Sequence, residues 1–461
     1  MTKTKHEARF TILVVSLLIA LGYQPVNLSA QSTFGSIRGT TQDQSGAVIG
    51  QAITTLHNVD ENTDFATSSD GAGNFLFENL KPGHYRLTVS KEGFANAVVD
   101  KVELTARQDI RLDLKLAVAS TNQQVEVQAA AAVVNTENAT LSDSKANTDI
   151  TQLPINSRAV SSSPLAALAV APSVTKDSQG NIAVGGATAS QTGFSVDGIS
   201  TASVRFNGSL QDAYPSLEGI AEMKVTAFNN NAEFAQIGDV TFVTKSGTNQ
   251  LHGSAFEYFQ NKDLDATILN FSSKAAKSFN TFGGSLGGPV TIPKLYRGKD
   301  KTFFFLDYEG NRKTQSYPEE LLVPTAAERT GNLNGLVAAT GTPLINPFTG
   351  GGFPNNMIPT GSCQACINPV AQALLNYYPL PNANLGVVNP SYNYQTLVPI
   401  PSHSNAFDAR LDHNISSKQQ IYARFSAKNA YYTEYNSAGT VLPANNFLPN
   451  DGANERNRSL V

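Results

Sequence analysis

The stretch 407–426, FDARLDHNISSKQQIYARFS, alternates apolar with polar residues on both sides of a polar turn. A period of two residues places successive side chains on opposite faces of a strand, so this stretch predicts an antiparallel hairpin with one apolar and one polar face. Strands of a transmembrane β-barrel have this pattern, with the apolar face toward lipid and the polar face toward a wet lumen. A water-soluble antiparallel sheet alternates in the same way, and periodicity alone leaves both alternatives open.

Earlier segments of the chain carry the same signal. Phe256 and Tyr258 alternate with a small and a charged neighbour, and residues 303–308 (FFFLDY) form an aromatic run that predicts another strand. Residues 317–402, between that run and the hairpin, are polar and rich in Pro, Gly and Asn. They predict a long surface loop with a short helix near residues 369–377.

Residues 150–250 contain turn-rich blocks that predict a small α+β domain. In chain order the blocks are 153–158 (LPINSR), 172–174 (PSV), 194–199 (FSVDGI), 215–225 (PSLEGIAEMKV), 231–234 (NAEF) and 244–253 (TKSGTNQLHG). Asp197 and Gly198 suit a hairpin turn, because glycine takes a positive φ without steric cost. Lys245, Ser246 and Gly247 suit a polar passage from this domain to the strand that follows it.

Residues 31–120 consist of short β-prone runs separated by turns. The clearest turn signals are 43–46 (DQSG), 69–74 (SDGAGN) and 81–83 (KPG), and the run 85–89 (YRLTV) alternates cleanly. Strands at roughly ten-residue spacing with Gly, Pro and Asp turns predict a β-sandwich.

Residues 121–149 shift toward Ala, Asn, Thr and Ser, which predicts a flexible linker. Within the linker, Gln124, Val125, Glu126 and Val127 form a short β-prone tetrad. Two interpretations stay open. The tetrad is either the last strand of the preceding sandwich or a segment offered to a partner protein as an added strand.

The first thirty residues predict a cleaved signal peptide. Basic residues up to Arg9 precede an apolar run at 10–21 that is too short to span a bilayer, and the small residues Ser29 and Ala30 offer a cleavage site. The alternative is an uncleaved N-terminal anchor. No long apolar helix follows in the sequence, so the exported chain either stays soluble or crosses a membrane as strands.

Charge and motif content exclude several function classes. The chain has 33 Lys+Arg and 37 Asp+Glu, a balance that argues against a nucleic-acid partner. Cys363 and Cys366 form a CxxC pair without βαβ surroundings or a second ligand pair, which favours a local disulfide over a redox or zinc site. The sequence shows no phosphate loop, triad or paired-carboxylate signature. We therefore expect no enzymatic activity, no bound metal and no cofactor.

Two resemblances to known families follow from these motifs. Residues 31–120 resemble the carboxypeptidase regulatory-like domain, a transthyretin-like sandwich that is not a peptidase, through 39–43 (GTTQD), 70–75 (DGAGNF) and 80–85 (LKPGHY). The ordered blocks of 150–250, together with 301–310 (KTFFFLDYEG) and 323–327 (VPTAA), resemble the plug and the first barrel strands of Oar-like TonB-dependent receptors.

The resemblance implies a mostly β protein and an uptake function. The expected order is a signal peptide at 1–30, a sandwich at 31–120, a linker at 121–149, a plug at 150–250 and antiparallel transmembrane barrel strands at 251–461. In this reading the tetrad Gln124–Val127 resembles a TonB box. The expected partners are a TonB-type energising protein of the inner membrane, outer-membrane lipid and an unknown large extracellular ligand, such as an oligosaccharide or a peptide. The sandwich would lie in the periplasm.

The strand count leads to one further expectation. Plugged transporter barrels of this class have about 22 strands. Residues 251–461 have room for roughly six to eight at about 25 residues per strand and loop, so we expect an incomplete barrel and a truncated chain. The alternative function is a cell-surface or periplasmic binding or adhesion protein whose sandwich is the working module.

Overall fold

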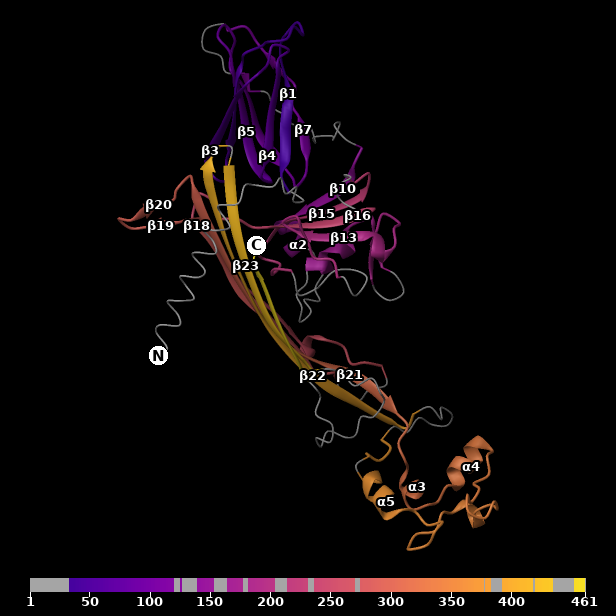
Figure 1. Cartoon of the computed structure of the whole chain (residues 1–461). Helices are drawn as coiled ribbons and strands as arrows, with labels where there is room; N and C mark the ends of the chain where they lie inside the picture. The colour runs from indigo at the N-terminus through magenta and orange to yellow at the C-terminus, as the bar shows by residue number, and fades with distance from the viewer. Residues whose placement is uncertain are drawn as a thin grey trace, which may run out of the picture.

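The computed structural model describes most of the chain in three modules (Figure 1). The described residues are 33–119, 125–126, 139–152, 164–176, 181–203, 214–230, 236–269, 274–376, 378–382, 392–417, 419–433 and 452–460. The predicted signal peptide at 1–30 lies outside them. Among the described helices, none has both the length and the apolar character that a membrane crossing requires.

The N-terminal module consists of two β-sheets that enclose one apolar core. Its strands are β1 (Gly35–Asp43), β2 (Ile53–Asn58), β3 (Thr63–Ser68), β4 (Asn74–Leu80), β5 (Gly83–Ser90), β6 (Ala97–Leu104), β7 (Asp109–Arg111), β8 (Leu114–Leu116) and β9 (Val125–Glu126). One sheet has the order β4-β1-β7, with β8 also paired to β1, and the other has the order β3-β2-β5-β6-β9. Ile37, Leu56 and Tyr85 are fully buried between them.

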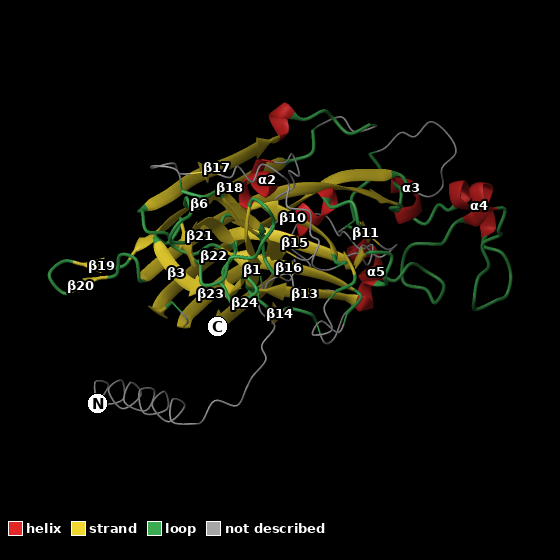
Figure 2. Cartoon of the chain, turned by 90° about the horizontal axis from the view of Figure 1, so that it is seen from above, coloured by secondary structure: helices red, strands yellow, loops and turns green. Residues whose placement is uncertain are grey.

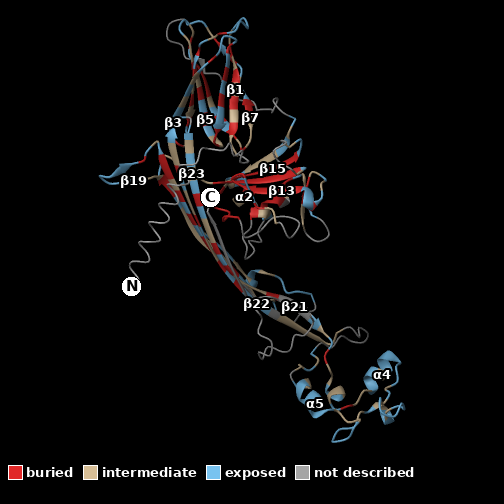
Figure 3. Ribbon diagram, viewed as in Figure 1, coloured by how far each residue is buried: buried red, intermediate tan, exposed pale blue. Residues whose placement is uncertain are grey.

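The central module is a five-stranded sheet with small helical segments. Its elements are β10 (Leu141–Ala146), α2 (Asn147–Gln152), η1 (Pro164–Val170), β11 (Val174–Lys176), β12 (Ile182–Val184), η2 (Ala189–Gln191), β13 (Thr192–Val196), β14 (Ile199–Ser200), β15 (Ile220–Phe228) and β16 (Gly238–Thr244). The sheet order is β10-β15-β16-β13-β14, and Figure 3 shows β13 and β15 as buried. Because β10 belongs to this sheet, the module begins before residue 150, within the predicted linker.

The third module is a long curved antiparallel sheet. Its strands, in spatial and chain order, are β17 (His252–Asn261), β18 (Lys277–Pro289), β21 (Thr302–Leu321), β22 (Tyr394–Ser416), β23 (Gln419–Thr433) and β24 (Gly452–Leu460). Smaller elements on its connections are η4 (Lys262–Leu264), β19 (Thr291–Ile292) and β20 (Tyr296–Arg297). We call this module the long sheet.

The predicted loop at 317–402 is wrong at both ends. β21 continues to Leu321 and β22 begins at Tyr394, with Pro318 paired opposite Leu397. Prolines at 318, 399 and 401 weaken the sequence signal for a strand, but proline is tolerated where its missing N–H is not needed by the ladder. The loop between the strands carries the short helices α3 (Ala326–Arg329), α4 (Asn334–Thr340), η5 (Pro354–Asn356) and α5 (Pro369–Leu375).

The N-terminal module and this helical loop lie at opposite ends of the long sheet. Figure 1 shows the N-terminal module beside the end of β22 and β23 where the two strands are joined. Figure 2 shows α3, α4 and α5 at the other end of the molecule from β19 and β20. The long sheet therefore separates two distinct ends of the protein.

The two faces of the long sheet differ in the way the hairpin 407–426 predicts. Phe407, Leu411 and Ile421 are 41%, 48% and 58% exposed, whereas Asp412 and Arg424 are 0% and 4% exposed. A water-soluble sheet buries its apolar face and exposes its charged one. Here the apolar face is open and the charged face is covered by the other two modules.

Candidate functional site at the junction of the modules

Six charged side chains from all three modules converge at one place on the covered face of the long sheet. They are Glu61 and Lys81 of the N-terminal module, Asp197 of the central module, and Arg410, Asp412 and Arg424 of the long sheet. We call this set the junction cluster. All six side chains are at most 10% exposed.

Asp197 reaches the cluster because it lies in a tight hairpin turn. Asp197 and Gly198 both have positive φ, 51° and 83°, and connect β13 to β14 with Val196 paired opposite Ile199. Two positive φ angles in a two-residue turn match the twist of the flanking strands. The carboxylate of Asp197 accepts hydrogen bonds from the backbone N–H and the hydroxyl of Thr244, each at 2.8 Å.

Two arginines of the long sheet bind this carboxylate. Nε of Arg424 lies 3.2 Å from Oδ2 of Asp197, and Nη1 of Arg410 lies 3.5 Å from Oδ1. Arg410 also donates to both carboxylate oxygens of Asp412, from Nε at 2.9 Å and from Nη2 at 3.0 Å. Alternation along β22 places residues 410 and 412 on the same face, so Arg410 is shared between Asp412 and the central module.

The N-terminal module enters the cluster through a lysine. Lys81 follows β4 in the turn to β5, and its Nζ lies 2.9 Å from Oε1 of Glu61 and 3.2 Å from Oδ1 of Asp412. The other oxygen of Glu61, Oε2, accepts from the amide of Asn414 at 2.7 Å. Charged groups removed from water need such partners, because an unpaired buried charge costs several kcal/mol. A cavity of about 80 Å³ lies beside these side chains.

A second contact joins the N-terminal and central modules directly. The turn between β6 and β7 holds Arg107, whose φ is 55°, and its Nη1 lies 2.8 Å from Oδ2 of Asp239 on β16. The N–H of Ala106 donates to Oε2 of Glu222 at 2.9 Å, and Nζ of Lys224 donates to the carbonyl of Ala106. Burial raises the pKa of Glu222 and lowers the pKa of Lys224.

The central module also contacts the long sheet at a serine. The hydroxyl of Ser216 donates to the carboxylate of Asp307 on β21, and its backbone N–H donates to Oδ2 of Asp408 on β22 at 3.3 Å. Ser216, Asp307 and Asp408 are all buried. The covered face of the long sheet is therefore hydrogen-bonded to the central module at more than one position along its strands.

The predicted passage Lys245–Gly247 leads from β16 to β17 and packs tightly against the long sheet. Nζ of Lys245 lies 3.8 Å from Oε2 of Glu218, and burial lowers the pKa of this lysine. A Cβ on Gly247 would lie 2.2 Å from the carbonyl oxygen of Phe304, closer than real contacts allow. Ser246 lines the cavity beside the junction cluster. Glycine is required at 247 because the backbone of β21 occupies the space of a side chain.

The predicted tetrad is described only at its two middle residues. Val125 and Glu126 form β9, which pairs in parallel with Ala97 and Val98 of β6 at the edge of the sheet. Gln124 and Val127 lie outside the described residues. The structure thus places β9 as an edge strand, where a partner strand could replace the pairing with β6.

The CxxC pair that the sequence singled out lies away from the junction. Cys363 and Cys366 are disulfide-bonded in the loop between β21 and β22. His57 and His84 contact Asp64 and Asp60 at exposed positions. Within the described part of the chain, no group of three His, Cys, Asp or Glu side chains could hold a metal ion.

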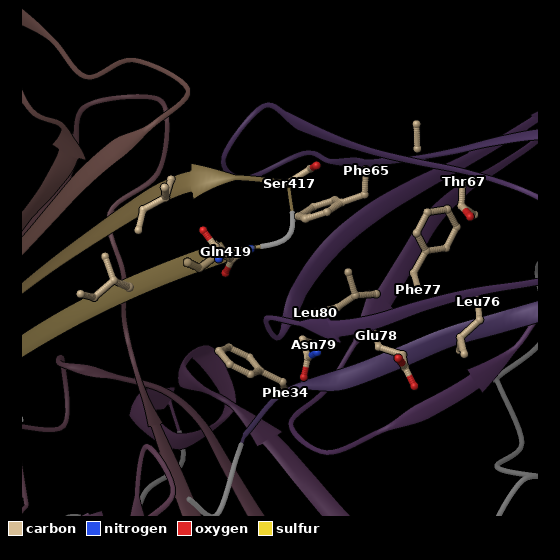
Figure 4. A pocket seen from close by; sticks show the side chains of 14 residues that line it. Phe34, Phe65, Thr67, Leu76, Phe77, Glu78, Asn79, Leu80, Ser417 and Gln419 are labelled. Atoms are coloured by element: carbon tan, nitrogen blue, oxygen red, sulfur yellow. The ribbon is translucent and has the colours of Figure 1, made fainter. Parts of the chain in front are cut away.

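A larger cavity of about 850 Å³ lies between the N-terminal module and the β22–β23 turn (Figure 4). Phe34, Phe65 and Leu80 line one side, and Ser417 and Gln419 line the other. Its lining mixes apolar, hydroxyl and amide side chains with the carboxylate of Glu78.

The sequence identified some members of the junction and missed others. It singled out Asp197 and Gly198 as a turn and placed Arg410, Asp412 and Arg424 on a polar face. It did not identify Lys81, Glu61 or Arg107. The only local signal for Lys81 is its position in a Lys-Pro-Gly turn, which says nothing of a contact with residue 412.

Comparison with known proteins matches the N-terminal module and the long sheet to families. A model of an outer membrane beta barrel domain matches residues 243–460, and a model of the carboxypeptidase regulatory-like domain matches residues 36–117. The TonB-dependent transporter Oar of Myxococcus xanthus is 25% identical over 295 residues, covering 60% of this chain and 27% of Oar. The chain thus spans about a quarter of the length of the curated relative it matches.

Likenesses to solved structures are partial. A 3-chlorocatechol 1,2-dioxygenase from Rhodococcus opacus matches with a TM-score of 0.17 at 12% identity, covering 21% of this chain and 64% of that one. A streptococcal ancillary pilin matches with a TM-score of 0.16 at 14% identity, covering 19% and 33%. Likenesses of this extent carry no argument about function.

Proposed function

Since this chain is a TonB-dependent receptor related to Oar, with an N-terminal carboxypeptidase regulatory-like domain, we propose that it serves active uptake across the outer membrane. The central module would be the plug, and the long sheet would be part of the barrel wall. The ligand enters from the end that carries α3, α4 and α5, and the N-terminal module lies in the periplasm. A cleaved signal peptide at residues 1–30 would direct export.

The inverted faces of the long sheet are the observation that carries this proposal. Leu411 and Ile421 project from an open apolar face, while Asp412 and Arg424 on the other face are buried beneath the N-terminal and central modules. Lipid would cover the open face, and the plug would fill the lumen. Charged groups at the plug–wall contact fit a plug that is held in place and yet can move. When water enters such a contact, an ion pair loses less free energy than packed apolar surface does.

Energy would come from a TonB-type protein of the inner membrane. The tetrad Gln124–Val127 is the proposed coupling segment, and β9 within it occupies a sheet edge. An edge strand exchanges its partner through main-chain hydrogen bonds without new side-chain pockets. We place the ligand among large molecules, such as oligosaccharides or peptides, and no enzymatic step or cofactor is part of the proposal.

The alternative of a surface binding or adhesion protein assigns the work to the N-terminal module alone. The buried contacts of Lys81 and Arg107 with the rest of the chain favour uptake over this alternative. A binding module would need its surface free, whereas this module shares charged side chains with the plug and the wall.

The test compares two lysine substitutions on exposed apolar residues. Leu411 is 48% exposed on the long sheet and Ile53 is 56% exposed on β2 of the N-terminal module. If the long sheet faces lipid, Leu411→Lys costs insertion free energy, up to the roughly 2–4 kcal/mol of a lysine at the bilayer midplane, and lowers the amount of heat-modifiable protein in the outer membrane. Ile53→Lys is the matched control and leaves the amount of heat-modifiable protein unchanged. Equal, small effects of both substitutions would contradict a lipid-facing sheet and would favour the alternative of a binding or adhesion protein.

A further inference from the structure

Lys81 is the member of the junction cluster that forms an ion pair between the N-terminal module and the barrel wall. It comes from a turn of the N-terminal module, yet its Nζ lies 3.2 Å from the carboxylate of Asp412, 331 residues away. The Asp412 side chain is 0% exposed and the Lys81 side chain is 10% exposed. A contact this well shielded from water is screened little by salt and is strongly felt by neighbouring charges.

Asp412 is shared between two cations with different attachments. Lys81 approaches it from the N-terminal module, and Arg410 approaches it from the adjacent position on the same face of β22. Arg410 in turn reaches Asp197 of the central module at 3.5 Å. The strength with which Arg410 attracts Asp197 therefore depends on how much of the charge of Asp412 is balanced by Lys81.

The charges of the complete cluster balance, and the N-terminal module supplies one carboxylate and one cation of the total. The carboxylates are Glu61, Asp197 and Asp412, and the cations are Lys81, Arg410 and Arg424. If Lys81 withdraws, Asp412 has Arg410 as its remaining cation in the cluster. Arg410 is then drawn toward Asp412 and away from Asp197, since a buried carboxylate without a full counter-charge is costly.

We infer that docking of the N-terminal module strengthens the attachment of the plug to the barrel wall, with Lys81 as the positioning residue that acts through Asp412 and Arg410. By linkage the effect is reciprocal, so loss of the plug contact also loosens the N-terminal module. This inference rests on the proposed assignment of the central module as a plug and of the long sheet as a wall. It gives the N-terminal domain a regulatory role in place of a passive spacer.

A second contact, between the N-terminal and central modules, supports this coupling. Arg107 of the same N-terminal module binds Asp239 of the central module at 2.8 Å. The N-terminal module thus touches the plug and the wall at the same time. Because the N-terminal module contacts both the plug and the wall, it can stabilise the contact between them. A force applied to this module would act on both.

The test measures hydrogen exchange of plug amides in outer-membrane vesicles from the native cell, using the chain as that cell makes it. Lys81→Met removes the charge and keeps an unbranched apolar side chain. We expect amide exchange in β16 (Gly238–Thr244) to rise on the order of tenfold, within the usual range of coupling between sites. Lys81→Arg keeps the charge and should keep exchange near the original rate. Lys91→Met is the matched control, because Lys91 binds the carbonyl of Gln51 within the N-terminal module.

Substitution of Asp412 separates the relay from a general loss of packing. Asp412→Asn removes the carboxylate that competes for Arg410, so plug exchange should stay at or below the original rate even though Lys81 loses a partner. The double variant Lys81→Met/Asp412→Asn should return plug exchange close to the original rate. Asp412 lies outside the N-terminal module, so Asp412→Asn remains informative if Lys81→Met prevents that module from folding.

Two results would overturn the inference. One is unchanged plug exchange in Lys81→Met while exchange in β2 and β5 shows the N-terminal module to be folded. The other is fast plug exchange in the Asp412→Asn variant or in the double variant, which would assign the effect to lost packing. The measurement needs no ligand and no transport. A failed uptake assay would leave this coupling standing, and a failed coupling would leave the proposed uptake untouched.

Discussion

The Nη1 atom of Arg107 lies 2.8 Å from the Oδ2 atom of Asp239, although 132 residues separate them in the chain. Their side chains are 11% and 5% exposed, so the pair is largely withdrawn from water. The N-terminal module is therefore docked on the central module by a shielded ion pair, and the docking should be measurable residue by residue.

Arg107→Ala should weaken this docking by about 3 kcal/mol, because it leaves the carboxylate of Asp239 without its cation in a buried site. The measurement is hydrogen exchange of the Ala106 amide, which donates to Glu222. We expect a rise of at least about tenfold, which corresponds to roughly 1.4 kcal/mol. Arg111→Ala is the control, since Arg111 pairs with Asp113 at the surface. If the Ala106 amide still exchanges slowly in Arg107→Ala, the assignment of Arg107 as an anchor is contradicted.

Gly247→Ala should disturb the passage between the central module and β17. The added Cβ would lie 2.2 Å from the carbonyl oxygen and 2.8 Å from the nitrogen of Phe304. Relief of this overlap requires the backbone to shift, at a cost of roughly 1–3 kcal/mol. Thermal unfolding in detergent should show a lower midpoint. Gly71→Ala, where a Cβ meets nothing within 4 Å, should leave the midpoint unchanged.

Glu222→Gln should raise stability at neutral pH. Burial raises the pKa of Glu222 above its ordinary value of 4.5, so the folded state binds this proton more tightly than the unfolded state. The stability contributed by this group is present below pH 4.5 and is lost as pH rises through the raised pKa. Glutamine retains an acceptor for the Ala106 N–H and removes this loss.

The check is the unfolding midpoint of the original chain and of Glu222→Gln from pH 4 to pH 8, a range that begins at about the ordinary pKa of a glutamate. The gain of the variant should grow as pH rises. Burial lowers the pKa of Lys224 from 10.5. The charged form of this lysine therefore destabilises the fold at low pH, and that cost falls as pH rises through the lowered pKa toward 10.5. Glu78→Gln at an exposed position of β4 is the control. A constant difference across the range would contradict titration of Glu222.

Val125→Pro should abolish binding of the TonB-type protein while leaving insertion intact. Proline has no backbone N–H and therefore cannot complete the ladder of an added strand. The measurement is co-purification with the periplasmic part of the energising protein, alongside the outer-membrane level of the receptor. If co-purification persists while the N-terminal module unfolds at lower temperature, the tetrad is the last strand of that module and not the coupling segment.

Local patterns in the chain predicted several of the strands and turns. The alternation of 407–426 corresponds to β22 and β23, and Asp197 and Gly198 form a two-residue turn. The errors arise where local signals are weak. β10 (LSDSKA) lacks an alternating apolar face, and prolines mask the outer ends of β21 and β22. These segments become strands because a neighbouring strand supplies hydrogen-bond partners, which no local pattern records.

By itself the sequence determined the position of the clearly alternating strands and the sorting of their side chains onto two faces, since a period of two residues is a property of the extended backbone. It also determined the family, because ordered motifs can be compared directly. Only the tertiary structure decided which charges meet. Lys81 and Asp412 are 331 residues apart, and their pairing depends on how the three modules pack together. A side chain's partner across modules is set by that packing and by the cost of a buried unpaired charge, and neither is local to the chain.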